Sequence, residues 1–154
     1  MKIMDFLNKN AINADLKSTR KKEIIKELAN LLVKAGEIKK PDELVKILMA
    51  RETLGSTGIG QGIGIPHGKS PNVKKLTAAF GLSKEGVDFE SLDGEPTRIF
   101  FLLVAPEESA GPHLKALARI SHLLKDKYFR DVLVKATDEN EIVRIIKSED
   151  SKKG

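Results

Sequence analysis

The stretch TRIFFLLVAP, residues 97–106, decides the fold class because it is apolar almost without interruption. A strand with one face in water alternates apolar and polar residues, whereas a strand covered on both faces has a continuous apolar run. We therefore predict a central strand over residues 97–106, in a sheet that carries helices on both faces. A second strand is predicted at residues 74–84, KKLTAAFGLSK, and the turn-rich residues 85–96 connect the two.

Helices are predicted before and after these strands. In the first of them, isoleucine and leucine recur at helical spacing between Ser18, the expected cap, and Gly36, the expected stop. Helices on both sides of the strands along the chain predict a three-layer α/β sandwich with a mixed central sheet flanked by helices. The predicted helices cover residues 18–36, 41–55, 112–126, 126–136 and 138–148.

No repeat, low-complexity linker or composition change divides the chain. We therefore predict a single domain at residues 1–148, followed by a frayed carboxyl-terminal tail at residues 149–154.

Composition excludes several function classes. The 154 residues include 27 Lys and Arg against 22 Asp and Glu, and the aromatic content is only 5%, so no nucleic-acid partner is predicted. The absence of cysteine excludes disulfides, thiolate zinc sites and a cysteine nucleophile within this chain. No apolar run approaches the ~18–20 residues that a membrane span requires, and the first residues do not resemble a signal peptide. We predict a cytoplasmic protein without membrane insertion.

A glycine-rich loop, GIGQGIGIPHGKS at residues 58–70, ends in the Gly-Lys-Ser of a nucleotide-binding P-loop. The P-loop pattern requires a glycine where this chain has Ile63, and Pro66 has no N–H to donate to a phosphate. The dinucleotide pattern Gly-x-Gly-x-x-Gly also finds no register in the loop. We therefore predict no nucleotide cofactor, and we interpret the loop as one that presents the imidazole of His67.

His67 lies between a proline that stiffens the loop and a glycine, Gly68, that leaves room beside the ring. A partner protein could then bring a phosphoryl group in line with a ring nitrogen. Neutral imidazole is nucleophilic near pH 7 and needs no separate base to remove a proton first. The alternative is an exposed loop histidine without a function.

Two further residues are candidates for the same site. His113 begins the predicted helix at residues 112–126, an end that favours anions; its alternative is a cap or an exposed residue. Arg51 ends the helix before the glycine loop, where its forked donors suit a phosphoryl group; its alternative is to pair with the helix dipole or with Glu52. His122 lies half a helical turn around from His113 and is assigned to the surface. The histidines lack the spacing of a zinc site, so no metal is predicted.

The stretch ARETLGSTGIGQGIGIPHGK, residues 50–69, resembles the phosphorylation-site segment of enzyme IIA proteins of the bacterial phosphoenolpyruvate-dependent phosphotransferase system, in the mannitol/fructose class that includes the nitrogen-regulatory branch. That segment has an acidic or amide residue, six positions, an aliphatic–Gly pair, two positions, and then aliphatic-Ala-aliphatic-Pro-His-Gly. Gly64 replaces the alanine, which is expected to loosen the loop slightly. The matching residues are Glu52, Ile59, Gly60, Ile63, Ile65, Pro66, His67 and Gly68.

The resemblance continues in FFLLVAPEESAGPHLKALARIS, residues 100–121, which looks like the later strand, loop and helix of this family. It implies that His67 is the phosphoryl acceptor and that His113 and Arg51 line its site. It also implies a phosphohistidine donor such as HPr and a cysteine of an enzyme IIB partner as acceptor, without metal or nucleotide. A role in fructose- or mannitol-type sugar uptake and a nitrogen-regulatory role both remain open, and so does a non-catalytic module that only binds anions.

Overall fold

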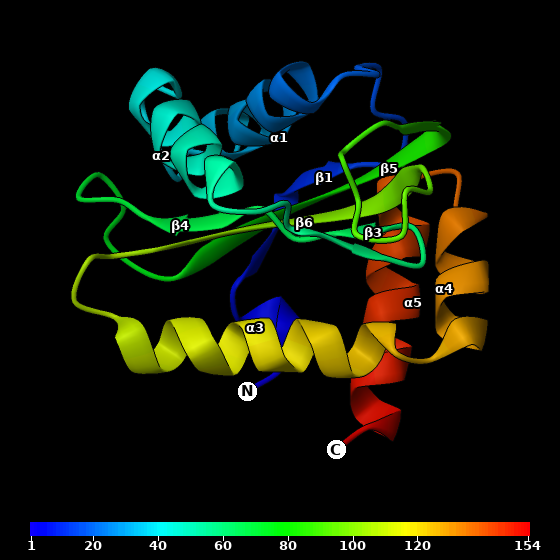
Figure 1. Cartoon of the computed structure of the whole chain (residues 1–154). Coiled ribbons are helices and arrows are strands. Elements are labelled where there is room, and N and C mark those ends of the chain that lie inside the picture. Colours follow the sequence, from blue (N-terminus) through cyan, green and yellow to red (C-terminus); the bar gives the residue numbers. More distant parts are fainter.

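The structure, a computed structural model, describes residues 1–154 and shows one six-stranded sheet with helices on both faces (Figure 1). The strands are β1 (Leu7–Asn13), β2 (Gly58–Gly60), β3 (Ile63–Gly64), β4 (His67–Lys69), β5 (Thr77–Val87) and β6 (Thr97–Ala105). The helices are the short 3-10 helix η1 (Ile3–Asp5) and the α-helices α1 (Lys21–Lys34), α2 (Asp42–Thr53), α3 (Ala110–Leu124), α4 (Lys127–Val134) and α5 (Glu139–Lys152).

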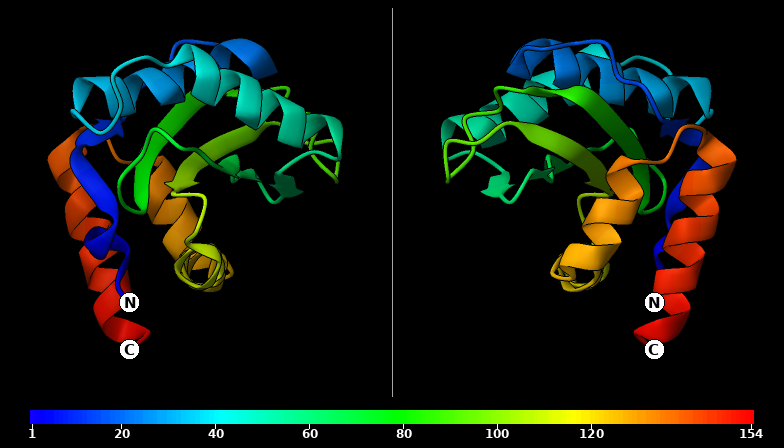
Figure 2. Two further views of the ribbon diagram at one scale, coloured as in Figure 1. Left: turned by 90° about the vertical axis from the view of Figure 1, so that its left-hand side faces the viewer. Right: turned by 90° about the vertical axis from the view of Figure 1, so that its right-hand side faces the viewer.

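The sheet is mixed, and its strand order is β1-β5-β6-β3-β2, with β4 also paired to β6. β5 and β6 are antiparallel, whereas β1 pairs with β5, and both β3 and β4 pair with β6, in parallel. Helices α1 and α2 cover one face, and α3, α4 and α5 cover the other (Figures 1 and 2). The predicted three-layer sandwich with a mixed sheet is confirmed. None of the helices is both long enough and apolar enough to cross a membrane.

Strand β6 is buried on both faces, as its apolar run predicts. Successive side chains of a strand point to opposite faces, so β6 supplies two cores at once. Phe101 packs edge to face against Phe80 in the core beneath α3, α4 and α5, with ring centroids 4.8 Å apart. Phe100 packs in the same way against Phe89 in the core beneath α1 and α2, at 5.2 Å. β6 thus contributes to the cores on both sides of the sheet, and it pairs with β3, β4 and β5.

Strand β1, at residues 7–13, was not predicted. Its sequence LNKNAIN has no regular alternation, and only Leu7, Ala11 and Ile12 are buried. The strand lies at the edge of the sheet, where it pairs with β5 alone. Its extended form therefore depends on a partner strand far along the chain, which local pattern does not reveal.

The start of α1 also differs from the prediction. Helix α1 begins at Lys21, and the residue at its N-cap is Arg20, which makes no side-chain capping bond. The N–H of Ser18 instead donates to Oε1 of Glu27 at 2.9 Å. The carboxylate of Glu27 thus holds the segment before the helix, and Ser18 is not a cap.

The carboxyl-terminal segment at residues 149–154 differs most from its predicted frayed state, because α5 continues to Lys152. Asp150 is only 3% exposed, and its carboxylate accepts the N–H of Ile3 at 2.6 Å. The same carboxylate pairs with the guanidinium of Arg119 on α3 at 2.7 Å. The last turn of α5 is therefore fixed to both the amino terminus and α3.

Candidate functional site

Strands β3 and β4 attach the glycine-rich loop to β6. Ile63 of β3 pairs with Ile99, and four residues later His67 of β4 pairs with Leu103. Between the two short strands, the carbonyl of Pro66 accepts the N–H of Leu103 at 3.0 Å. The backbone of His67 is therefore held by the central strand of the sheet.

The glycines of the loop make a tight turn between β2 and β3. Gly60, Gln61 and Gly62 have φ angles of 96°, 57° and 78°, in the left-handed region that glycine adopts most easily. The N–H of Gln61 donates to the carboxylate of Asp93 at 2.9 Å. This hydrogen bond, followed by one from the N–H of Glu95, lowers the pKa of Asp93. The glycines thus allow the tight turn of the β2–β3 hairpin.

At Gly64, where an alanine was expected from the resemblance, the surrounding side chains lie close to the backbone. A Cβ at this position would lie 3.1 Å from ring carbons of Phe100 and 3.1 Å from Cγ2 of Thr97. An alanine at this position would therefore require the Phe100 ring or the Thr97 methyl group to move by a few tenths of an ångström.

The side chain of His67 points toward the face of the sheet that α3 covers. Its neighbour Gly68 faces α2, because a Cβ there would lie 2.9 Å from Cγ2 of Ile47. Since side chains alternate along a strand, His67 and Lys69 both face the opposite side. An imidazole and an ammonium group, both of which can bind an anion, thus lie on one face of β4.

One ring nitrogen of His67 is already occupied. Its Nδ1 lies 2.7 Å from the carbonyl oxygen of Ile65, and a carbonyl oxygen can only accept a hydrogen bond. The proton of the neutral ring is therefore on Nδ1, and Nε2 keeps its lone pair. The ring is half-buried, and Nε2 is the nitrogen available as a nucleophile.

His113, in the first turn of α3, is the neighbour of this ring. The two ring centroids are 5.6 Å apart, with an interplanar angle of 67°. His113 is only 8% exposed, and its Nε2 is buried without a hydrogen-bond partner. A buried polar atom without a partner is costly, which makes this nitrogen a candidate for a hydrogen bond to a bound group.

Burial lowers the pKa of His113 below its ordinary value, and the electrostatic repulsion that a protonated His113 meets from the neighbouring His67 and Lys69 side chains lowers it further. At neutral pH the His113 ring is therefore uncharged, with one nitrogen that donates and one that accepts.

This lowered pKa predicts a pH dependence of stability. The unfolded chain binds a proton at His113 near pH 6.5, whereas the folded chain binds it only at lower pH. Between these two values the unfolded state holds more protons, so the free energy of unfolding falls as the pH decreases below the ordinary pKa. One proton contributes at most about 1.4 kcal/mol per pH unit. Urea unfolding of wild type and of His113→Gln is measured from about pH 8 to pH 5. The free energy of unfolding should fall more steeply with decreasing pH in the wild type than in the variant. The same pH dependence in both proteins would contradict the prediction.

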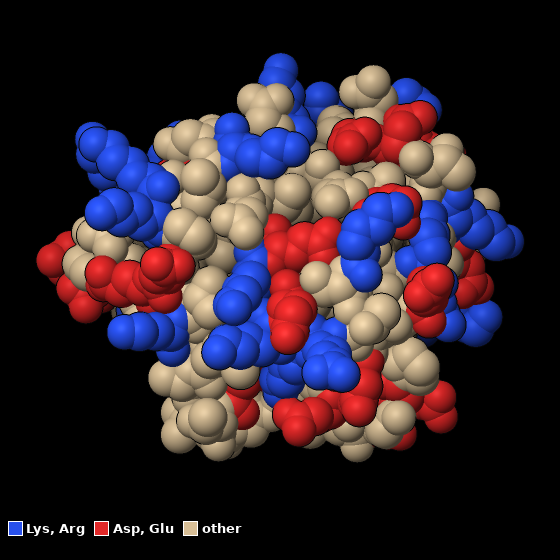
Figure 3. All heavy atoms as spheres, turned by 90° about the horizontal axis from the view of Figure 1, so that it is seen from above, with Lys and Arg blue, Asp and Glu red and all other residues tan.

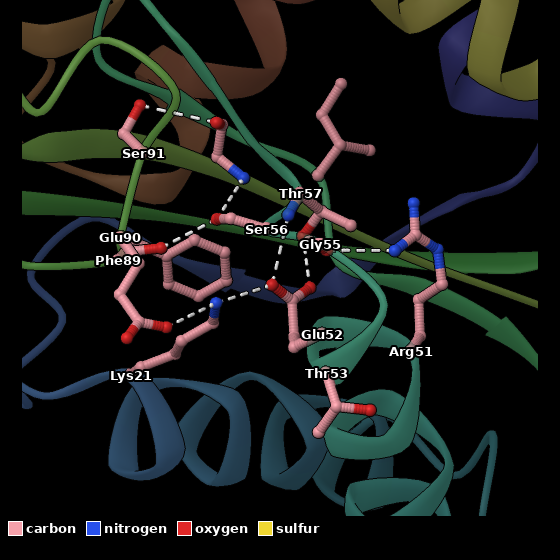
Figure 4. A network of polar contacts seen from close by, with 12 residues as sticks. Lys21, Arg51, Glu52, Thr53, Gly55, Ser56, Thr57, Phe89, Glu90 and Ser91 are labelled. Carbon is pink, nitrogen blue, oxygen red and sulfur yellow. Dashed lines mark hydrogen bonds and ion pairs between the residues drawn. The ribbon is translucent and has the colours of Figure 1, made fainter.

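Arg51 lies in the last turn of α2, as predicted, and its Nη1 donates to the carbonyl of Gly55 at 2.9 Å. It does not pair with Glu52, because the Glu52 carboxylate turns to Lys21 and Thr57 (Figure 4). The structure thus brings His67 and His113 together, and it holds Arg51 at the residues that lead into the loop. His122, assigned to the surface from the sequence, is exposed.

Two lysines near this region were not predicted. Lys69 was detectable, since it is two residues from His67 in an extended segment and must share its face. Lys21 has no such local signal, because its partner Glu52 lies on another helix. No three His, Asp or Glu side chains gather in a way that could hold a metal ion.

The family model described as the phosphoenolpyruvate-dependent sugar phosphotransferase system, EIIA 2, matches residues 5–149. The chain belongs to this EIIA 2 family. The resemblance drawn from residues 50–69 and 100–121 is thereby confirmed. EIIA 2 chains are components of a phosphotransferase system, so this one is a member of a phosphoryl-carrier family.

Relatives of this EIIA 2 chain have two kinds of name. The fructose-specific EIIABC component of Bacillus subtilis is 41% identical over 150 residues, which are 97% of this chain but 24% of that protein. The nitrogen regulatory protein of Bradyrhizobium diazoefficiens is 40% identical over 148 residues, which are 95% of both chains. The chain thus spans about a quarter of the first relative and nearly all of the second.

Solved structures agree on the fold of the EIIA 2 chain. The nitrogen regulatory protein IIA-Ntr of Neisseria meningitidis superposes with a TM-score of 0.86 at 34% identity, covering 94% of this chain and 98% of that one. The IIA mannitol structure of Escherichia coli superposes with a TM-score of 0.77 at 26% identity, covering 89% and 96%.

Proposed function

We propose that this EIIA 2 chain carries a phosphoryl group on Nε2 of His67. The observation that carries the proposal is the hydrogen bond from Nδ1 of His67 to the Ile65 carbonyl, which leaves Nε2 free beside His113. The lone pair of Nε2 attacks the phosphorus of a phosphohistidine on an HPr-like donor. The donor's P–N bond breaks, and the donor imidazole leaves with the electron pair. In the second step, a cysteine thiolate of an enzyme IIB partner attacks the phosphorus and releases Nε2.

His113 is proposed to stabilise the phosphoryl oxygens. Its unpartnered Nε2 faces no protein acceptor, so when it carries the proton it is free to donate to an incoming oxygen. Because His113 is buried, such a hydrogen bond is stronger than the same bond in water. The start of α3 adds the partial positive charge of a helix N-terminus.

Arg51 and Lys69 are proposed to supply full positive charge. The Arg51 guanidinium uses one N–H for the Gly55 carbonyl, which leaves further donors for phosphoryl oxygens. Lys69 lies on the His67 face of β4. Phosphoryl transfer depends mainly on positioning and on neutralising the charge of the three oxygens, and these residues would provide both.

For the acceptor, we propose an enzyme IIB of fructose- or mannitol-type sugar uptake, as in the names of the Bacillus and Escherichia relatives. The second candidate is a nitrogen-regulatory protein that signals through its phosphorylation state. It is favoured by the Bradyrhizobium relative, because the alignment covers 95% of both chains. Transfer of the phosphoryl group to a IIB protein separates the two roles.

The test is intact-mass spectrometry after incubation with HPr, its phosphorylating enzyme and phosphoenolpyruvate. We expect the mass to increase by one phosphoryl group, the group to be lost in acid, and a purified IIB partner to remove it. A module that only binds anions would show no covalent phosphate, and that result would contradict the proposal.

A further inference from the structure

A buried carboxylate joins the end of α2 to the start of the glycine-rich loop. The side chain of Glu52 is 3% exposed, and its Oε1 accepts the N–H of Thr57 at 3.0 Å. Its Oε2 accepts the hydroxyl of Thr57. The Nζ of Lys21, the first residue of α1, lies 2.9 Å from Oε1, and the Lys21 side chain is 12% exposed (Figure 4). Thr57 is thus held by a carboxylate that has one buried counter-ion.

Lys21 is itself fixed in place. Its Nζ lies 4.8 Å from the centroid of the Phe89 ring, and it also pairs at 3.1 Å with Glu90, whose side chain is 73% exposed. Ser56, the residue directly before Thr57, donates its hydroxyl to the carbonyl of Phe89 at 2.8 Å. Of the two carboxylates, Glu52 is the buried one, so the loss of Lys21 would leave its charge unpaired in the protein interior.

Two further hydrogen bonds connect Thr57 to His67. The carbonyl of Thr57 accepts the N–H of Ile65 at 3.0 Å. The carbonyl of the same Ile65 accepts the proton on Nδ1 of His67 at 2.7 Å. A displacement of Thr57 therefore displaces the group that fixes the orientation and the protonated nitrogen of the His67 ring.

From these contacts we infer that Lys21 and Glu52 are positioning residues for His67, acting through Thr57 and Ile65. They do not touch the phosphoryl group. Without the Lys21 ammonium, a charged Glu52 carboxylate is destabilised in the protein interior, which favours its protonation or its rotation toward water. Either change weakens the two hydrogen bonds that it accepts from Thr57. The Ile65 carbonyl then no longer holds Nδ1 of His67 in one place, and Nε2 loses its alignment with the incoming phosphorus.

The charged side chains on this face of the molecule form no patch of one sign (Figure 3). Viewed from above α1 and α2, positive and negative side chains are interspersed over the face (Figure 3). Lys21, by contrast, has a specific buried partner. The pair of Arg119 with Asp150, on α3 and α5, has nearly the same burial, with side chains 12% and 5% exposed. It belongs to other elements and serves as a matched control.

The experiment compares Lys21→Met, Lys21→Arg, Glu52→Gln and the control Arg119→Met. One measurement is the rate of phosphorylation per folded molecule, and it rests on the proposed function. The other is the ¹⁵N NMR spectrum of the His67 ring in the unphosphorylated protein, which does not. We expect Lys21→Met and Glu52→Gln to lose about ten- to a hundredfold in rate, since small misplacements of a reacting group have effects of this size. In these two variants, the ¹⁵N chemical shifts of the two His67 ring nitrogens should move toward each other, as expected when the two tautomers interconvert.

The conservative Lys21→Arg should keep both the rate and the ring spectrum near those of wild type. Arg119→Met should lose stability with both readouts unchanged. The inference is overturned if Lys21→Met and Glu52→Gln keep the wild-type rate per folded molecule and the wild-type ring shifts. If Lys21→Met fails to fold, the neutral double variant Lys21→Met/Glu52→Gln gives the same two readouts. If the wild type takes up no phosphate, the proposed function fails, and the NMR spectra still decide the positioning role.

Discussion

His67→Ala protein is expected to take up no phosphate under conditions that phosphorylate the wild-type EIIA 2 chain to completion. The substitution removes Nε2, the proposed nucleophile. We do not expect His113 to replace it, because its Nε2 is buried and is proposed to donate a hydrogen bond to a phosphoryl oxygen. The chain also has no cysteine that could accept the group. We expect the rate to fall by at least about 10³-fold, as for the loss of other reacting groups.

The measurement is the intact mass over time, and the matched control is His122→Ala. His122 lies on α3 like His113 but is exposed, so its removal should leave the rate unchanged. An acid-labile phosphate that still forms on His67→Ala protein would refute the assignment of the acceptor.

Asp150→Ala is expected to lower the free energy of unfolding by about 3–5 kcal/mol, the range for breaking a buried ion pair from one side. The Asp150 carboxylate is the partner of both the Arg119 guanidinium and the Ile3 N–H. Its removal leaves a largely buried positive charge without its carboxylate and a buried N–H without its acceptor. Deletion of residues 149–154 should have an effect at least as large.

Urea unfolding checks this prediction, with Asp131→Asn as control. Asp131 pairs with Lys127 on the surface, where the side chains are 54% and 80% exposed, and its loss should change stability by less than about 1 kcal/mol. If Asp150→Ala behaves like this control, the end of α5 does not anchor the fold, and the predicted frayed tail was the better description.

What the sequence predicted well depends on contacts that are local or periodic. The apolar run of β6 requires cover on both faces, and Phe100 and Phe101 lie in the two separate cores. The Pro-His-Gly pattern within residues 58–70 indicated a presented imidazole, and the structure places His113 beside it. Such features follow from residues that are neighbours in the chain or in one element.

What the sequence did not predict depends on distant partners. Asp150 is buried because Ile3 and Arg119 meet it, and these residues are 147 and 31 positions away. Strand β1 is extended because β5 lies beside it. Glu52 was a suggested partner for Arg51, but the fold brings Lys21 of another helix to its carboxylate. The sequence pattern within one helix or strand does not predict such contacts between distant elements.

The central claim is that Nδ1 of His67 is held by the Ile65 carbonyl so that Nε2 carries the phosphoryl group. The most direct test is a long-range ¹H–¹⁵N NMR spectrum of the phosphorylated protein labelled with ¹⁵N-histidine. We predict that phosphorylation changes the Nε2 resonance of His67 and splits it by coupling to phosphorus, while Nδ1 keeps its proton. Phosphorus bonded to Nδ1 of His67, or to either nitrogen of His113, would contradict the claim.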